Sequence, residues 1–289
     1  MENLLRPIYQ ERASHPETLG VIVIEKTKPH HPLTDNFDVV LLIIVSNNEK
    51  PWLVKHYEFE DKRAAMHVVS EQQVHDWLLT GSHRRLVAWL VNGKIIFDRN
   101  EYISGLKERI RDFPAEERTR KIGVEFAKLI RRYMDGKELF ASKQYMDAYN
   151  FILHALHHLA RLSVIEHGFH PEITVWNQVK HIEPEIFKLY TELLTGEDPL
   201  DKRLELLLLA NDFSLSSKSF NATLHIRKVM NEREGVWTYQ ELLEDDQLKE
   251  YGIDLGALLE YMVEKELVEV LLSETKGEGI YSRQYRAKS

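Results

Sequence analysis

Two short runs rich in valine and isoleucine constrain the fold of this chain more than any other feature of its sequence. Leu19–Glu25 and Asp38–Val45 have the length and the bounds of strands buried within a sheet. Further strands are expected at Trp52–Phe59, Ala64–Val69 and Gly93–Asp98, and helices at Glu2–Ala13, after Ser70 (which fits a capping box with Gln73) and at Glu101–Asp112. The first 114 residues therefore predict a sheet with helices.

The pattern becomes helical near residue 115. Apolar residues recur at helical spacing from Ile122 to Tyr133 and again from Tyr145 to Leu162, where they continue through five turns. Shorter helices follow, punctuated by prolines, and Leu204–Ala210 closes the set. Residues 115–217 are therefore expected to form an all-helical bundle.

The last part, residues 218–289, has the element order of a winged helix-turn-helix. A helix is expected around Phe220–Glu232, a second after the capping box of Thr238 and Glu241, and a third at Leu255–Lys265 with Asp254 as its cap. Two strands, Leu267–Leu272 and Ile280–Arg286, are joined by a glycine-containing turn. The expected domains are thus 1–114, 115–217 and 218–289.

Composition narrows the class of protein. Of 289 residues, 43% are hydrophobic and 29% charged, which predicts a packed core rather than disorder. Cysteine is absent, which excludes disulfides, thiolate catalysis and cysteine-based zinc sites and fits a reducing compartment, so a cytoplasmic location is expected. No apolar run predicts a signal peptide or a membrane segment. The net charge of −8 argues against general attraction to nucleic acid or anionic lipid.

One motif joins the first two predicted strands to a known chemistry. Nucleotidyltransferases of the polymerase-β type hold divalent metals on two or three carboxylates of adjacent strands, and two of the acids lie two residues apart so that both face one side. Here Asn36-Phe37-Asp38 precedes the apolar run Val39–Leu42 and follows the strand Val21–Ile24 at the expected interval. The chain resembles the bacterial nucleotidyltransferase-like family, which joins a degenerate transferase domain, a helical substrate-binding-like domain and a C-terminal helix-turn-helix domain.

This resemblance covers nearly the whole chain and implies an α+β fold. The expected fold is a nucleotidyltransferase-like mixed sheet with helices, followed by an all-helical bundle and a C-terminal winged helix-turn-helix. Departures from the family motif fall on the catalytic positions: Ile24-Glu25 replaces the Gly-Ser turn, Asn36 replaces the first acid, and the third acid would fall near Ala65 or His67. Asp38 is the retained acid and the candidate catalytic residue; its structural alternative is a residue that begins a strand.

One retained carboxylate is too few for a Mg²⁺ pair. The sequence therefore predicts a protein that has lost the standard chemistry and binds a nucleotide or a protein partner. An active transferase with a rebuilt site remains an alternative. It would use Mg²⁺ and join Asp38 to Asp35, Glu25 or Glu58.

Polar residues gather on one face of the helix that spans Tyr145–Leu162. His154, His157, His158 and Arg161 lie opposite its apolar stripe. His154 and His158 have a spacing that can bind a metal, but no third ligand is identifiable, which favours a polar or groove-lining face. If that face lines a groove against the transferase-like domain, it would suit an anionic ligand. The candidate groove residues are Asn36, His67, His154, His158 and Arg161.

Two other patterns have simpler interpretations. Arg161 and His167 are close to the spacing of helical ribonucleases, but that spacing is common by chance among 14 histidines. Eight basic residues lie between Arg118 and Lys143, and five acids, two of them at Glu116 and Glu117, reduce the net charge of the stretch to +3, which favours a solvated helix face.

The predicted winged helix raises DNA as a partner, so a transcriptional regulator is a further alternative. Residues 236–289 carry 12 acidic and 6 basic residues, a net of −6. Three glutamates and one lysine lie on Leu255–Glu266, the helix that would enter the major groove. This charge favours protein contact over DNA. The sequence does not predict an oligomeric state.

Overall fold

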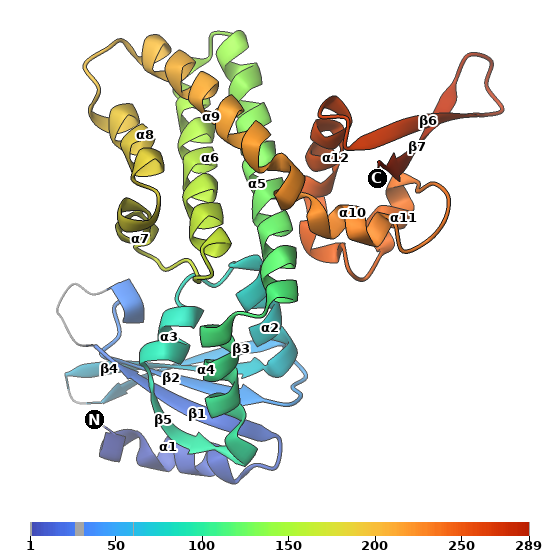
Figure 1. Cartoon of the computed structure of the whole chain (residues 1–289). Coiled ribbons are helices and arrows are strands. Elements are labelled where there is room, and N and C mark those ends of the chain that lie inside the picture. Colours follow the sequence, from blue (N-terminus) through green and yellow to red (C-terminus); the bar gives the residue numbers. More distant parts are fainter. Residues whose placement is uncertain (1, 27–31, 60, 289) are drawn as a thin grey trace. The chain divides into compact units, whose positions relative to one another are not determined.

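The computed structural model describes residues 2–26, 32–59 and 61–288, with side chains from residue 6 onward. The chain divides into two compact units (Figure 1). A sheet unit comprises residues 1–114 and 169–174, and a helical unit comprises residues 115–168 and 175–289. The division into three domains at 114 and 217 stays a prediction.

A five-stranded mixed sheet forms the centre of the first unit, with strand order β3-β4-β2-β1-β5. Its strands are β1 (Thr18–Glu25), β2 (Val39–Val45), β3 (Trp52–Phe59), β4 (Lys62–Ser70) and β5 (Lys94–Asp98). Only β2 and β4 pair in parallel, and the other neighbours are antiparallel. Every residue of β2 is buried, as its uninterrupted apolar sequence predicts for a central strand.

The two faces of this sheet are covered by different helices (Figure 1). One face packs against α1 (Glu2–Ser14), and its core contains Val39, Leu41 and Met66. The other face packs against α2 (Glu71–Thr80), α3 (Leu86–Asn92) and α4 (Tyr102–Asp112). Edge strand β3 is less covered on this second face, where Trp52 is 45% exposed. We call this uncovered part, formed by the even-numbered residues of β3 and their neighbours on β4, the open sheet face.

The second unit is built on two long helices, α5 (Ala115–Ala141) and α6 (Tyr145–Glu166), which pack along one another (Figure 1). A Cβ atom on Gly136 of α5 would lie 2.9 Å from Ile152, so glycine permits the close approach of the two helices. The bundle is completed by α7 (Val175–Ile182), α8 (Pro184–Thr195) and α9 (Leu200–Ala222).

The C-terminal part of this unit contains short helices and a β-hairpin. Its elements are α10 (Leu224–Met230), α11 (Tyr239–Glu244), η3 (Lys249–Asp254), α12 (Leu255–Glu264), β6 (Val268–Glu274) and β7 (Tyr281–Ala287). Its buried residues, among them Tyr251, Leu258 and Tyr285, belong to the same hydrophobic core as Leu129 of α5. The helix-turn-helix part and the bundle are therefore stabilised by one core.

The predicted fold class is confirmed, with local corrections. The Thr238–Glu241 capping box forms, and Ser70 accepts the N–H of Gln73. Helix α3 was not predicted, and the expected Leu204–Ala210 segment is part of the longer α9. Asp254 precedes α12 but makes no side-chain capping bond, because its backbone is helical and its carboxylate faces Arg131 at 3.7 Å. No helix among the described residues is long and apolar enough to cross a membrane.

Candidate functional site

Asp38 fixes the start of β2 against β4. Its N–H donates to the carbonyl oxygen of Arg63 at 2.8 Å, and its Oδ2 accepts the N–H of Arg63 at 2.9 Å. Both bonds hold the strand ends together where the parallel pairing of β2 and β4 begins. The candidate catalytic residue thus has a structural partner on the neighbouring strand.

The strand register identifies the residue level with Asp38. Val40 pairs with Ala65 and Leu42 with His67. Continuing this register by two residues toward the start of each strand places Asp38 level with Arg63, on the same face. Glu58 of β3 is opposite Arg63 in the antiparallel pair. An arginine therefore occupies the middle strand between two acidic positions.

The other acids considered for a rebuilt site have different positions. Glu25 pairs with Val39 and lies two residues from Val23 on the same strand, so its side chain is on the α1 face, opposite to that of Asp38. Asp35 forms an ion pair with Arg85. Asn36 is exposed. Within residues 2–26, 32–59 and 61–288, no group of three His, Asp or Glu side chains could hold a metal ion.

His67 belongs to an aromatic cluster beside the open sheet face. Its Nδ1 accepts the indole N–H of Trp52 at 3.1 Å, and the two rings stack with centroids 5.9 Å apart. Trp89 lies 4.9 Å from the His67 ring and donates its indole N–H to the carbonyl oxygen of Leu33. His83 stacks on Trp77 at 4.4 Å and approaches Trp89 at 4.7 Å.

The cluster keeps His67 neutral at physiological pH. Burial lowers the pKa of His67 to about 4, and the neighbouring His83 and His56 act in the same direction. The pKa of His83 is also lowered, first by burial and then by Arg85. His67 therefore serves as a hydrogen-bond acceptor and a stacking surface, with its imidazole uncharged.

In the helical unit, two of the predicted groove residues meet on a buried carboxylate. Glu125 of α5 is 3% exposed, and its Oε1 lies 2.8 Å from Nδ1 of His158 and 3.0 Å from Nε of Arg161. Both partners come from α6. We call Glu125, His158, Arg161 and the adjacent Lys121 the buried charge cluster.

The charges of this cluster are strongly coupled. Burial raises the pKa of Glu125, but Arg161 and the hydrogen bond from His158 outweigh it and lower the pKa to about 2. Burial lowers the pKa of Lys121 to about 7, although Glu125 partly offsets this effect. The expectation that the charges of α5 form a solvated face is wrong for Lys121 and Glu125, because packing against α6 removes both from water.

The remaining histidines of the α6 face lie elsewhere. His154 is exposed. His157 contacts Trp176 and Tyr190, whose rings stack at 3.8 Å. The structure thus brings His158 and Arg161 together and directs His157 to an aromatic stack. The burial of Glu125 was not predicted, although a signal for it exists: Glu125 is the acid that falls on the apolar stripe of α5 beside Phe126 and Leu129.

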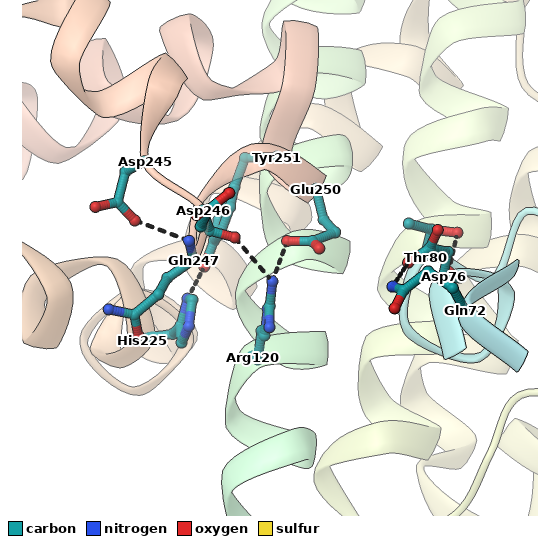
Figure 2. A network of polar contacts seen from close by, with 10 residues as sticks. All are labelled: Gln72, Asp76, Thr80, Arg120, His225, Asp245, Asp246, Gln247, Glu250 and Tyr251. Carbon is teal, nitrogen blue, oxygen red and sulfur yellow. Dashed lines mark hydrogen bonds and ion pairs between the residues drawn. The ribbon is translucent and has the colours of Figure 1, made fainter. Parts of the chain in front are cut away.

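A second polar network joins α5 to the C-terminal elements (Figure 2). Arg120 bonds to the carboxylate of Glu250 and, at 3.5 Å, to the carbonyl oxygen of Asp246. His225 of α10 is 2.9 Å from the hydroxyl of Tyr251, and burial followed by Arg120 lowers the pKa of His225 to about 4. Gly123 lies over the same hydroxyl, which a Cβ atom would approach to 2.1 Å.

The mixed sheet and the helices that follow it define a protein of the nucleotidyltransferase-like class. Family models match the chain in the same order: nucleotidyltransferase-like over residues 1–118, YgxA-like substrate binding domain over 119–218, and helix-turn-helix domain over 224–287.

The relatives narrow this class. The chain is 52% identical over 288 residues to the "uncharacterized protein YgxA" of Bacillus subtilis (strain 168), covering 100% of this chain and 98% of that protein, and it therefore belongs to the YgxA family of nucleotidyltransferase-like proteins. A crystal structure of a nucleotidyltransferase-like protein from Exiguobacterium sibiricum 255-15 is 43% identical and matches with a TM-score of 0.84 over 99% of both chains.

Proposed function

We propose that this protein is a cytoplasmic, non-catalytic member of its family that binds a nucleotide through the open sheet face. The observation that carries the proposal is the position of Arg63, level with Asp38 and bonded to it through the backbone. A guanidinium at that level opposes binding of Mg²⁺ and favours a phosphate group, for which its planar donors are suited. Cysteine-free composition supports the proposed location.

The aromatic side chains of the same face supply the second part of the proposal. Trp52 is 45% exposed and is held by His67, so its ring is oriented before a ligand arrives. Phe37 lies 4.6 Å from the ring of His56 on the same face. Stacking of a base on an exposed aromatic ring contributes roughly 1–3 kcal/mol and accepts any base. A nucleotide fits this combination, because its base can stack on Trp52 while its phosphate groups bind Arg63.

The helical unit supports an anionic ligand as well. Glu125 is the acid of the buried charge cluster. Arg161 and Lys121 belong to the same cluster, and the charge of Lys128 also lowers the pKa of Glu125. These cations gather around the cluster, with Glu117 and Asp254 as further acids nearby. We propose that His154, His158 and Arg161 line a surface of the helical unit that accepts the phosphate part of a ligand.

A thermal-shift titration tests the ligand. We expect ATP, GTP, CTP or UTP to raise the melting temperature in EDTA as well as in Mg²⁺, because Arg63 replaces the metal as the phosphate partner. Arg63→Ala should remove most of the shift, while Arg111→Ala, at an exposed arginine of α4, should keep it. If none of the four nucleotides shifts the melting temperature, the nucleotide part is wrong and a protein partner takes its place.

A turnover assay tests the loss of chemistry. Purified protein with labelled NTPs, Mg²⁺ or Mn²⁺ and small-molecule acceptors should release no pyrophosphate above the blank. Release that disappears in Asp38→Ala would establish the alternative, a metal-dependent transferase whose site is rebuilt around Asp38.

The helix-turn-helix match raises duplex DNA as a second candidate partner. Two cations of the hairpin are engaged by acids, Arg283 with Glu260 at 2.8 Å and Arg286 with Glu269 at 2.5 Å. We therefore propose that this part contacts protein, and we expect no salt-sensitive retention on duplex DNA. Retention that Arg283→Glu abolishes would instead support a regulator. Point variants are the suitable test, because deletion of residues 236–289 would open the shared core.

A further inference from the structure

Helix α9 exposes an apolar stripe on the side that faces away from the bundle. Leu206, Leu209, Phe213 and Phe220 are 61%, 64%, 79% and 58% exposed. The opposite side of the helix carries the buried residues Leu204, Leu207 and Leu215. The helix is thus apolar on both sides, although only one side contributes to the core of its own chain.

The spacing of the exposed residues is that of a helix-pairing seam. Leu206, Leu209, Phe213, Ser216 and Phe220 follow one another at intervals of three, four, three and four residues. This is the a/d repeat with which one helix packs against another helix. A flat sheet or a small molecule would not require a stripe that continues over four turns, so the pattern indicates a helical partner.

From this seam we propose that α9 pairs antiparallel with α9 of a second copy of the chain, forming a two-fold dimer centred on Phe213. Under that symmetry Leu206 faces the partner's Phe220, and Leu209 faces the small side chains around Ser216. At the two ends of the seam a large side chain, Leu206, therefore meets another, Phe220. Between the ends and the axis, Leu209 meets the smaller side chains around Ser216. A two-fold interface requires such a self-complementary patch.

A recess beside the seam fits this arrangement. A cavity of about 680 Å³ opens next to Phe213. Its wall combines Tyr133, Met134 and Tyr261 with charged side chains, among them Glu264 and Lys265. Aromatic side chains that enter such recesses are the usual anchors of protein interfaces. Under the proposed symmetry the second copy offers its Phe213 for this role.

The area of the seam is also compatible with a second copy, and its charges are partly compensated. Lys137 and Lys202 have acidic neighbours, Asp212 at 3.8 Å and Glu205 at 2.9 Å. Lys265 donates to Ser216 at 2.9 Å and Arg227 lies 4.0 Å over the Phe220 ring, so these two cations border the seam itself. The four exposed apolar side chains offer on the order of 500 Å² per copy, a large part of the roughly 800 Å² that a standard interface buries on each partner.

Sedimentation equilibrium of the full chain tests the proposal. We expect a reversible dimer of twice the 34.0 kDa chain mass. Phe213→Glu should weaken dimerisation by about 100-fold or more, as loss of a central aromatic anchor does. Met146→Glu, at a residue of α6 that is 74% exposed outside the seam, should leave it unchanged. A wild-type monomer, or a Phe213→Glu protein that stays dimeric, would overturn the proposal.

The cysteine-free chain permits a second test that does not disturb the aromatic anchor. Ser216→Cys introduces a single thiol close to the proposed two-fold axis, and a short bismaleimide should link two chains through it. Ser142→Cys, at an exposed serine after α5, should remain unlinked under the same conditions. Equal cross-linking of the two variants, or none at Ser216→Cys, would contradict the seam.

Discussion

Asp38 in the sheet unit and Glu125 in the helical unit are two carboxylates that each bond to an arginine, yet their surroundings differ. Asp38 is partly exposed and accepts a backbone N–H from Arg63. Glu125 is 3% exposed and meets two side chains, those of His158 and Arg161. Water can replace the partner of the first carboxylate but not those of the second. The comparison teaches that the partner of the exposed carboxylate is the more replaceable of the two.

The largest expected effect follows from removing the buried carboxylate. Glu125→Ala leaves Arg161 and Lys121 without their acid, so the free energy of unfolding of the helical unit should fall by about 3–5 kcal/mol. Glu125→Gln keeps a hydrogen-bonding side chain of the same size and should cost less. Chemical denaturation followed by circular dichroism measures both variants. An alanine variant as stable as the wild type would mean that the cluster is open to water.

Packing gives the next largest effect. A Cβ atom at Gly123 would lie 2.1 Å from the Tyr251 hydroxyl, so Gly123→Ala should destabilise the helical unit by about 1–3 kcal/mol. Gly105→Ala is the matched control on α4 of the sheet unit, because no atom lies within 4 Å of the new methyl group. Helix propensity then predicts a small gain there. Adding Tyr251→Phe to Gly123→Ala should recover part of the loss; no recovery would locate the strain elsewhere.

A pH dependence should distinguish the buried charge cluster from exposed charges. The pKa of Lys121 falls from 10.5 to about 7 on folding, so between these values the unfolded chain holds a proton that the folded chain has released. Stability should therefore rise with pH, by up to ~1.4 kcal/mol per pH unit from this group. Lys121→Met should flatten the rise between pH 7 and 9, whereas Lys137→Met, at an exposed lysine of the same helix, should not. Parallel slopes in all three proteins would refute the burial of Lys121.

The smallest effect is expected at the sheet carboxylate. Asp38→Ala removes one acceptor from a partly exposed N–H, so the free energy of unfolding should fall by about 0.5–1.5 kcal/mol. Nucleotide-induced thermal shifts should persist, because Arg63 remains. Denaturation midpoints and the thermal-shift titration report the two quantities. A loss comparable to that of Glu125→Ala would erase the contrast between the two carboxylates.

Local signals were read correctly from the sequence where they depend on a few neighbouring residues. The strand β2 and the capping box of Thr238 and Glu241 are examples, since an apolar run and a four-residue motif contain their own evidence. Asp254 has the residue type of a cap, but its backbone conformation and Arg131 direct its carboxylate elsewhere. Helix α3 has only seven residues and no capping bond, so it carried too weak a periodic signal.

The candidate site was less accessible to sequence because it depends on pairing between distant segments. The position of the third acid near Ala65 or His67 stays a prediction. The register between β2 and β4 is what brings Arg63 level with Asp38, and neither segment alone contains that information. The burial of Glu125 likewise depends on which residues of α6 face it, and α5 alone does not contain that information.

Each unit is assembled from segments that are distant in the sequence, and this has a consequence for synthesis of the chain. Residues 169–174 complete the sheet unit, yet they leave the ribosome only after α5 and α6. Residues near the C-terminus, such as Tyr285, complete the core built on α5. The sheet unit therefore stays incomplete until α6 has been made, and the helical unit until the last residues, so each exposes part of its core while the chain grows.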